Sequence, residues 1–478
     1  MNDIDQFLYL RIAKTFENQI VKEVIRLGDK LPSLRSICKQ YDVSQSTAMQ
    51  AYYYLESKFL IESKPKSGYY VSYSSKHYAS IPEISKPGDF EGDQEDMENL
   101  IDKVYRQITN SKTTILSLSV PAPELLPIAK LNKAMVNALR SLPASGTAYE
   151  HIQGNVKLRR QIARLSHPIE LSLTEDDLII TDGCMNAISY AMMAIAKPGD
   201  TIIVESPVYF GILQLAKILN LKVLELPTHP QTGIELEAFK RAVETKKISL
   251  CLLVSNFSNP LGSCMPNEHK KEMVNLIQKH NVPLIEDDIY GDVYFGLNRP
   301  KTCKTYDESG LVLWCNSISK TLAPGYRVGW IAPGKFKDQI LKLKKCHSIS
   351  SPTLSQEVIG SFLETGRYEH HLRKLRSTLQ ANSINFLNAV HESFPEDVKI
   401  NRPEGGFVLW VELDKKINTV DLYEKAIKRN ISIAPGSMFT LQKQFSNCMR
   451  LSYGMKWDAT VAQSLKTLGM ISKGLMGE

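Results

Sequence analysis

The sequence predicts an α/β protein, in which a small helical domain precedes a larger part built on a mainly parallel, buried sheet. Three observations lead to this prediction. Beyond residue 113, short apolar runs alternate with segments of helical periodicity, as in βαβ units whose strands are covered on both faces. Before residue 76, helical patterns precede two short extended runs. The chain of 478 residues is long enough for roughly two to four domains.

The N-terminal segment begins with an apolar stripe of helical spacing. Four large side chains recur every four residues, as on one face of a helix: Ile12, Phe16, Ile20 and Val24. Ser33 is predicted to cap a second helix, LRSICKQY, because a serine oxygen accepts a hydrogen bond from a free amide of the first turn. After a turn at Asp42 and Val43, Ser44 is predicted to cap a third helix.

The third helix is predicted to bury Ala48, Ala51, Tyr52 and Leu55 on its inner face. Two extended runs, FLIES and YYVSY, follow it and are separated by KPKSG, which suits a hairpin turn. Helix, helix, turn, helix and hairpin is the order of a winged helix-turn-helix. In that fold the third helix enters the major groove of DNA, and the hairpin contacts the backbone or the minor groove.

The side chains that such a domain would present to DNA are polar or basic. Glutamine pairs with adenine edges, serine and threonine bond to bases or phosphates, and basic side chains neutralise phosphates. The outward residues of the third helix are Gln45, Ser46, Thr47, Met49 and Gln50, and basic candidates are Arg35, Lys64 and Lys66. Residues 1–75 hold ten Lys and Arg against eight Asp and Glu, so this pattern also fits a helical protein-interaction domain.

The sequence motifs of residues 28–71 favour a DNA-binding domain over a protein-interaction domain. Gly-Asp, Leu-Pro-Ser-x-Arg, Val-Ser-x-x-Thr, a Leu-Glu pair and a wing ending in Ser-Gly-x-x-Val follow one another, and the segment resembles the GntR-type DNA-binding domain. The resemblance implies DNA contacts by Ser33, Arg35, Ser44, Gln45, Ser46, Thr47, Lys66 and Gly68. Gln45 stands where that family most often has arginine. This departure affects which DNA base sequence the domain is expected to prefer.

Composition changes sharply near residue 75. Residues 83–99 are acidic, rich in Gly and Pro, and poor in large apolar side chains. We therefore predict a flexible acidic linker over residues 76–112, with a short helix around MENLIDKVYRQI. It would join a DNA-binding domain at 1–75 to a second domain at 113–478, with a large part at about 150–345 and a small part at about 113–149 and 346–478.

Seven apolar runs predict the strands of the large part. They are DLIIT (177–181), TIIVE (201–205), KVLEL (222–226), LCLLVS (250–255), PLIEDD (283–288), LVLWC (311–315) and RVGWI (327–331). A later run, GGFVLWVEL (405–413), then helices and ISIAPGSMF (431–439), predict a smaller α+β subdomain.

Composition points to a cytoplasmic protein. The start MNDIDQFLYL has no basic region before an apolar core, and no apolar run approaches about 18 residues. The eight cysteines are scattered without a CxxC pair, which favours reduced thiols over disulfides or a metal site. The net charge of +7 permits a polyanionic partner without requiring one.

The stretch SISKTLAPGYRVGW, residues 317–330, places one lysine at the end of an apolar strand. A desolvated Lys320 has a lowered pKa and suits a Schiff base, although a lone lysine is usually a solvated loop residue. Ser317 and Ser319 offer hydroxyls, and Arg327 offers a fork that matches a phosphate. Together they suit a phosphorylated aldehyde cofactor.

Pyridoxal phosphate also requires partners for its ring nitrogen, its phenolic oxygen, its phosphate and its ring face. Residues at the ends of the predicted strands are candidates for each. Asp287 can face the ring nitrogen, and Asn259 and Tyr290 can face the phenolic oxygen. Gly183 precedes a helix whose first amides, from Cys184 and Met185, suit the phosphate, and the ring of Tyr209 can stack on the pyridine. Each residue also has an ordinary interpretation as a solvated acid, a turn or a core side chain. Their common position at the carboxyl ends of strands, where α/β sheets bind ligands, favours the site.

The chain from about 113 to 478 resembles a fold-type-I, class I and II aminotransferase, whose signature Ser-x-Ser-Lys-x-x-x-Pro-Gly-x-Arg it carries. The resemblance implies Lys320 as the Schiff-base lysine and the cofactor roles above for Asp287, Asn259, Tyr290, Ser317, Arg327 and Tyr209. It also implies a homodimer, assembled head to tail, in which Tyr149 reaches the partner's cofactor phosphate, and Arg450 as the clamp for a substrate carboxylate. Asp182 departs from the family, which commonly has a small hydroxyl residue there.

Both parts in this order resemble the MocR-type transcriptional regulators. The resemblance implies a regulator that binds double-stranded operator DNA and senses an amino compound by external aldimine formation at Lys320. A working aminotransferase with a regulatory or vestigial DNA-binding domain is the main alternative, and a scaffold that binds DNA and cofactor without responding to a ligand is another. An amino acid, a polyamine-like amine and the cofactor itself stay open as the effector.

Overall fold

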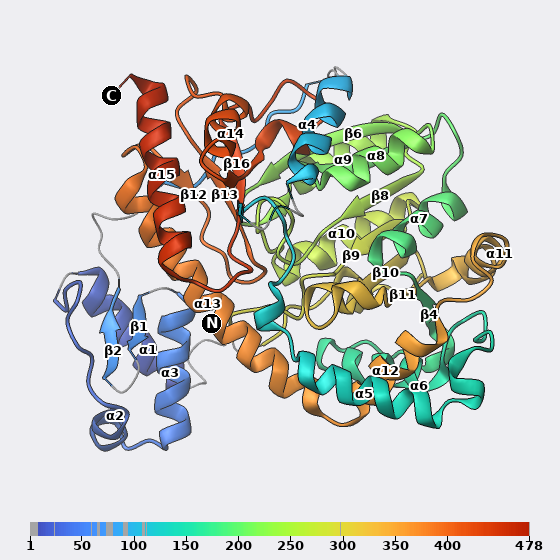
Figure 1. Cartoon of the computed structure of the whole chain (residues 1–478), viewed down its shortest axis with the longest axis horizontal. Coiled ribbons are helices and arrows are strands. Elements are labelled where there is room, and N and C mark those ends of the chain that lie inside the picture. Colours follow the sequence, from blue (N-terminus) through green and yellow to red (C-terminus); the bar gives the residue numbers. More distant parts are fainter. Residues whose placement is uncertain are drawn as a thin grey trace.

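The computed structural model describes residues 8–22, 24–58, 60–64, 67–72, 80–88, 94–107, 110, 112–296 and 298–477. We call residues 8–72 the N-terminal domain and residues 112–477 the C-terminal domain. Figure 1 shows the N-terminal domain in blue beside the much larger C-terminal domain, in which helices surround a central sheet.

The N-terminal domain has the predicted order of elements. Helices α1 (Leu8–Val21), α2 (Leu34–Tyr41) and α3 (Gln45–Ser57) precede an antiparallel hairpin of β1 (Ile61–Lys64) and β2 (Gly68–Val71). Three members of the predicted stripe on α1 are buried: Ile12, Phe16 and Ile20. Val24 is a correction, because α1 ends at Val21 and the Val24 side chain is 70% exposed.

Local capping fixes the helix ends as the sequence predicts. The Ser33 hydroxyl accepts a hydrogen bond from the Ser36 amide at 3.2 Å, and Ser44 accepts one from the Thr47 amide at 3.2 Å. The inner face of α3 is fully buried, as predicted, by Ala48, Ala51, Tyr52 and Leu55. The three helices therefore share one small core.

For the described parts of the predicted linker, residues 80–88 and 94–107, the structure shows attachment to the C-terminal domain instead of a flexible segment. The Ser85 hydroxyl accepts a hydrogen bond from the Thr228 amide at 2.9 Å, and the Gly88 amide donates to the Gln442 side chain at 2.6 Å. Helix α4 (Gln94–Arg106) buries an apolar stripe in the core of the C-terminal domain: Met97, Leu100, Ile101 and Val104. The short helix predicted around MENLIDKVYRQI is therefore present as α4, but the acidic average composition of the segment gave no indication that the helix packs on the C-terminal domain.

The large sheet has eight strands in the order β4-β11-β10-β9-β8-β5-β6-β7. The bounds are β4 (Ile179–Thr181), β5 (Thr201–Ser206), β6 (Lys222–His229), β7 (Gly233–Ile234), β8 (Leu250–Leu253), β9 (Leu284–Asp287), β10 (Val312–Ser317) and β11 (Gly329–Ala332). Neighbours from β10 to β6 run parallel, whereas β11 is antiparallel to both β10 and β4. All seven predicted strands lie in this sheet, so the predicted fold class is confirmed.

Alternate side chains of the strands enter two cores, one on each face of the sheet. On β5, Ile202 and Val204 join one core and Ile203 joins the other. Helices α7 (Cys184–Ile195) and α8 (Phe210–Ile218) pack in the first core, and α9 (Leu236–Thr245) and α10 (Asn267–His280) pack in the second. This burial on both faces explains the continuous apolar runs in the sequence.

The rest of the C-terminal domain is a mixture of helices and a smaller sheet. The sheet has the order β12-β13-β16-β15, with β12 (Lys399–Ile400), β13 (Val408–Glu412), β15 (Ala434–Pro435) and β16 (Cys448–Ser452). Strand β14 (Ile431–Ser432) pairs with β3 (Thr114–Ile115). The helices are α5 (Ile128–Ser141), α6 (Val156–Ser166), α11 (Lys337–His347), α12 (Thr353–Glu364), α13 (Arg367–Ser393), α14 (Thr419–Ile427) and α15 (Ala459–Met476). Within the described part of the chain, no helix combines the length and apolar character that crossing a membrane requires.

Candidate functional site

A cavity of about 260 Å³ opens where β9 and β10 end and α7 begins, and we call it the central cavity. It lies at the carboxyl edge of the parallel strands, where α/β sheets place ligands. Ten of the predicted residues line it: Cys184, Met185, Tyr209, Asn259, Asp287, Tyr290, Ser319, Lys320, Arg327 and Arg450. Residues that are up to 266 positions apart in the chain (184 to 450) thus meet at one place.

The amine of Lys320 is buried inside this cavity. It donates a hydrogen bond to the Ser119 carbonyl and lies 5.8 Å from the centre of the Tyr290 ring. Burial, together with the nearby charge of Arg450, lowers the pKa of Lys320 to about 8, although the Asp287 carboxylate works against this shift. A lowered pKa leaves more of the amine neutral, and only the neutral amine attacks an aldehyde.

This pKa gives a pH-dependent prediction. At pH 7 a lysine of pKa about 8 is neutral about 300 times more often than one of pKa 10.5. The rate at which the apoprotein takes up pyridoxal phosphate is expected to rise with pH and to level off above about 8. Stopped-flow absorbance across pH 6–10 measures it, and a rate that keeps rising to pH 10 would contradict the lowered pKa.

The carboxyl group of Asp287 lies at the end of β9 and faces α7. The Cys184 thiol donates to it at 3.2 Å and the Ile289 amide at 3.1 Å. Burial raises the pKa of Asp287 to about 6, so the group is mostly ionised at pH 7 and would hold a proton on a basic ring nitrogen beside it. A positive ring nitrogen would in turn lower this pKa.

The neighbouring Asp288 is held by a separate network, which fixes the end of β9. Its carboxylate accepts hydrogen bonds from Arg299 at 2.6 Å, from the Trp314 indole at 2.9 Å and from Asn256 at 2.9 Å. These partners leave Asp288 no freedom to enter the central cavity. The two acids of the predicted strand end therefore have different surroundings, and only Asp287 lines the cavity.

The N-terminus of α7 and Arg327 form the end of the cavity that suits an anion. Gly183 has φ +97°, and a Cβ there would lie 2.4 Å from Nη2 of Arg327. A Cβ on Gly329 would lie 2.5 Å from the Gly183 backbone. Both glycines are thus required for the close approach of β11, Arg327 and the free amides of α7. Arg327 also donates to the Asp182 carbonyl at 2.8 Å.

Tyr290 and Arg450 also line the central cavity. The Tyr290 hydroxyl lies 2.8 Å from the Ser119 hydroxyl, and the Asn259 amide donates to it at 3.4 Å. Arg450, on β16, donates to the Asn259 side chain at 2.8 Å and to the Ser117 carbonyl. Within the described part of the chain no carboxylate forms an ion pair with Arg450, although its side chain is buried. A buried cation without a counter-charge favours binding of a carboxylate.

Tyr209 precedes α8 and lines the cavity together with residues of α4. A Cβ on Gly211 would lie 2.6 Å from the Tyr209 ring, so this glycine makes room for it. The Tyr105 ring, on α4, packs edge-on against Phe210 at 5.7 Å and also lines the central cavity. Tyr105 was not predicted as a site residue, because residues 76–112 were interpreted as a linker.

Ser117 and Ser119 also line the cavity and were not predicted. They occur in the alternating stretch LSLSV after β3, and this polar alternation was the only signal that could have indicated them. Of the predicted residues, Ser317 does not line the cavity, and its hydroxyl accepts a hydrogen bond from the Ser319 amide at 3.3 Å. Tyr149 lies outside the cavity, and its side chain is 83% exposed.

Two buried polar atoms test whether the cavity suits pyridoxal phosphate. The Ser319 hydroxyl and Nε of Arg450 line the cavity region without hydrogen-bond partners among the described residues. Buried polar groups are normally bonded, so these donors indicate a polar ligand. An amine, an acid and an anion-binding helix end lie around the same cavity, and this set of groups fits the cofactor.

The predicted DNA-binding residues lie together on the N-terminal domain. Arg35, Gln45 and Ser46 are exposed at the starts of α2 and α3, whereas Ser33 and Ser44 serve as caps. Gly68, at φ +110°, begins the second wing strand, beside Lys30 and Lys64, whose amines lie 5.7 and 4.7 Å from the Tyr70 ring. Lys66 lies outside the described residues.

Two family profiles match the chain. Residues 113–465 match aminotransferase class I and II, and residues 8–71 match bacterial regulatory proteins of the gntR family. The two matches together cover most of both described domains.

Relatives with both parts cover nearly the whole chain. An uncharacterized HTH-type transcriptional regulator of Escherichia coli K12, YjiR, is 36% identical over 465 residues, which are 96% of this chain and 98% of that protein. The HTH-type transcriptional regulator NorG of Staphylococcus aureus USA300 is 27% identical over 438 residues, which are 91% of this chain and 98% of that protein.

Solved aminotransferases share the fold of the C-terminal domain. The multiple substrate aminotransferase of Thermococcus profundus has a TM-score of 0.74 at 25% identity, over 79% of this chain and 95% of that one. LysN, the α-aminoadipate aminotransferase of Thermus thermophilus, has a TM-score of 0.74 at 24% identity, over 80% of this chain and 97% of that one.

Proposed function

The chain belongs to the aminotransferase class I and II family and, with its gntR-type domain, to the MocR-type transcriptional regulators, and from this we propose that it senses an amino compound through bound pyridoxal phosphate. Members of the aminotransferase family use this cofactor and are typically dimeric, and gntR-type domains bind DNA. The single observation that carries the proposal is Lys320, a buried amine with a pKa lowered to about 8, in one cavity with Asp287, Arg327 and Arg450.

Each group of this chain has a definite task in the proposed site. Pyridoxal phosphate, when bound, supplies an aldehyde that condenses reversibly with amines and a ring that withdraws electrons. Lys320 provides the amine that holds the aldehyde and that an incoming amine displaces. Asp287 would hold a proton at the ring nitrogen, and Tyr290 and Asn259 would donate hydrogen bonds to the phenolic oxygen.

The ends of the cavity select the ligand. Arg327 and the first amides of α7, from Cys184 and Met185, would bind the phosphate, and Ser317 would support them by fixing the turn that carries Ser319. The Tyr209 ring, which lines the cavity, would cover one face of the pyridine. Arg450 binds a carboxylate, so the effector of highest affinity is an amino acid or another amine that carries an acid group.

A partner subunit completes the site in this proposal. Tyr149 is a large side chain that is 83% exposed, and exposed aromatic side chains of this size are typical of interfaces. In a head-to-tail homodimer it would reach the phosphate of the partner's cofactor. Each dimer would then present two N-terminal domains to an operator with two half-sites.

The proposal is tested by a genome-fragment binding screen with the cofactor-loaded protein, repeated in the presence of a panel of amino acids and amines. A regulator binds a few fragments tightly, and one class of amine changes that affinity. If no fragment is preferred while amino acids are turned over at ordinary enzyme rates, the protein is an aminotransferase. The catalytic groups present make that second function a real alternative.

Arg35 gives a prediction for the DNA-binding side. Replacement by alanine is expected to weaken binding to the best fragment of the screen about tenfold and to lower the salt dependence by about one ion, because one phosphate contact is lost. Binding assays at several salt concentrations measure both effects. Cofactor binding should not change, and Lys416→Ala, which removes an exposed charge from the C-terminal domain, serves as the control. Unchanged affinity in Arg35→Ala would contradict the assigned DNA face.

A further inference from the structure

The wall of the central cavity carries no charge beyond the groups that already have a task. Its charged lining residues are Asp287, Lys320, Arg327 and Arg450. In the proposed function they serve the ring nitrogen, the aldehyde, the phosphate and the effector carboxylate. No further charged side chain lines the cavity in the described part of the chain. The side chain of an effector therefore meets only neutral groups of this chain.

The amine of Lys320 and the guanidinium of Arg450 are anchored close to each other. Lys320 donates a hydrogen bond to the Ser119 carbonyl, and Arg450 donates one to the Ser117 carbonyl. These two carbonyls belong to one segment, and two residues of extended chain span at most about 7 Å. The short spacing fits an α-amino acid, whose amino group and carboxylate share one carbon atom.

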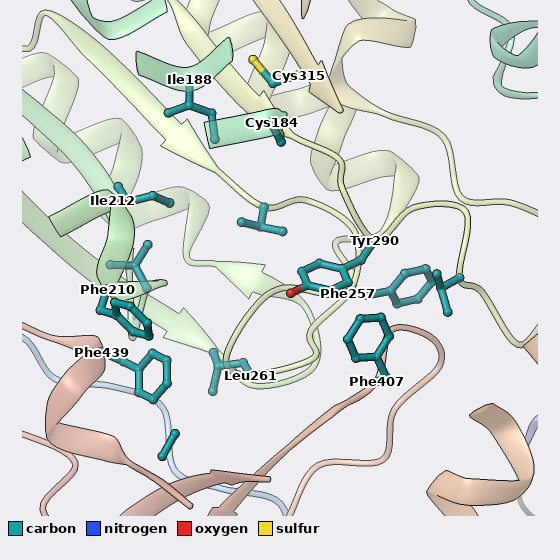
Figure 2. Close-up of a cluster of buried hydrophobic side chains, with 14 of the residues drawn as sticks. Cys184, Ile188, Phe210, Ile212, Phe257, Leu261, Tyr290, Cys315, Phe407 and Phe439 are labelled. Atoms are coloured by element: carbon teal, nitrogen blue, oxygen red, sulfur yellow. The ribbon is translucent and has the colours of Figure 1, made fainter. Parts of the chain in front are cut away.

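A row of aromatic rings leads from α4 to Arg450. The Tyr105 ring packs edge-on against Phe210 at 5.7 Å, and the Phe210 ring lies 5.9 Å from the Phe439 ring. The guanidinium carbon of Arg450 lies 5.1 Å from the centre of the Phe439 ring. Figure 2 shows Phe210 and Phe439 side by side. The group that would hold the carboxylate is thus bordered by aromatic side chains.

Tyr105 stands at the entrance of the cavity. It lines the cavity although its side chain is 42% exposed, and its hydroxyl is hydrogen-bonded with that of Tyr209. Val104, Phe210 and Met438 line the cavity as well. The cavity therefore offers aromatic and aliphatic contacts between α4 and the carboxylate-binding arginine, and such contacts suit an apolar side chain.

We propose that the effector is an α-amino acid with an aromatic or large aliphatic side chain, which packs against Tyr105 and Phe210. The inference rests on the proposed function, in which the effector carboxylate binds Arg450 and its amino group displaces Lys320.

Acidic and basic amino acids are excluded on electrostatic grounds. A second carboxylate would be buried without a cation to pair with, since Arg327 serves the phosphate. A second ammonium group would be buried near Arg450 without an acid, since Asp287 serves the ring nitrogen. Burial of an unpaired charge is strongly unfavourable, so a neutral side chain is selected.

The first experiment compares matched ligands on the cofactor-loaded wild-type protein, by spectral titration and by isothermal titration calorimetry. L-Phenylalanine is expected to bind at least about tenfold more tightly than L-alanine, because its ring is removed from water. L-Norleucine should bind at least about tenfold more tightly than L-lysine, and L-methionine than L-glutamate, since each charged ligand buries an unpaired charge. β-Alanine, whose amino and acid groups are one carbon further apart, should bind at least about fivefold more weakly than L-alanine.

The second experiment tests the position of the side chain. In Tyr105→Ala the preference for L-phenylalanine over L-alanine is expected to fall at least about fivefold, because an aromatic contact is lost. Tyr105→Phe keeps the ring and should keep this preference within about twofold. Asn99→Ala, at an exposed position of α4 that does not line the central cavity, should leave it unchanged. The ratio of two amino acids cancels any change in cofactor affinity.

Any of four results would overturn the inference: L-lysine or L-glutamate binding as tightly as its neutral counterpart, L-alanine binding as tightly as L-phenylalanine, β-alanine binding as tightly as L-alanine, or a Tyr105→Ala protein that keeps the wild-type preference. In each of these cases amino acids still bind, so the proposed function stands. A cofactor-loaded protein whose spectrum no amino acid changes, and which binds none by calorimetry, refutes the proposed function and the inference with it.

Discussion

Lys320→Ala is expected to abolish covalent retention of pyridoxal phosphate and the visible absorbance of the lysine-bound cofactor. The remaining contacts from Asp287, Arg327 and the α7 amides would hold the cofactor reversibly, with affinity reduced at least about 100-fold, which corresponds to about 2.7 kcal/mol. Absorbance spectra, borohydride reduction followed by mass spectrometry, and equilibrium dialysis measure these losses.

A matched control exists in the same chain. Lys344 is a second buried lysine whose pKa is lowered to about 8, but its amine donates to the Ile180 carbonyl at 2.6 Å outside the central cavity. Lys344→Met should keep the visible band. If Lys320→Ala folds and retains a cofactor that borohydride fixes to the protein, the lysine is wrongly assigned.

Arg450→Met is expected to remove the preference for ligands that carry a carboxylate. The wild type should bind an α-amino acid about 100-fold more tightly than the matching amine without the acid, because Arg450 is a buried cation with no acidic partner among the described residues. The variant should bind the two alike. Spectral titration of the cofactor-loaded protein with L-alanine and ethylamine, and with further pairs, measures the ratio.

The control for this experiment is Arg376→Met. Arg376 lies 4.0 Å over the Tyr294 ring and does not line the central cavity, so its removal should leave the ratio unchanged. A wild type that binds each amine as tightly as its amino acid would contradict the assigned role of Arg450, and would point to a polyamine-like effector.

Local sequence signals were sufficient to predict the elements of the N-terminal domain and the strands of the large sheet. Ser33 and Ser44 were predicted as caps because a cap depends only on residues within one helical turn. Val24 was wrongly assigned to α1, since the spacing of apolar residues does not reveal where a helix ends. The strand-end residues Asp287 and Lys320 could be predicted because topology alone brings the ends of parallel strands together.

Long-range packing accounts for what the sequence did not reveal. Tyr105 lines the central cavity because α4 folds back onto α8, and no pattern within residues 76–112 indicates that contact. Ser319, and not Ser317, lines the cavity wall, although both stand in the same motif. Two hydroxyls two residues apart differ in role through the turn between them, which a motif does not specify.

The attachment of residues 80–88 to the C-terminal domain limits the span that the regulator can bridge on DNA. The Ser80 carbonyl accepts a hydrogen bond from the Ile400 amide at 2.9 Å, and Ser72, at the end of the wing, lies only eight positions earlier in the chain. A chain of that length reaches at most about 28 Å when fully extended. In the proposed homodimer, an N-terminal domain that leaves the C-terminal domain can therefore travel no further than about one turn of the double helix. Widening the gap between operator repeats by two helical turns is then expected to abolish simultaneous binding of both N-terminal domains.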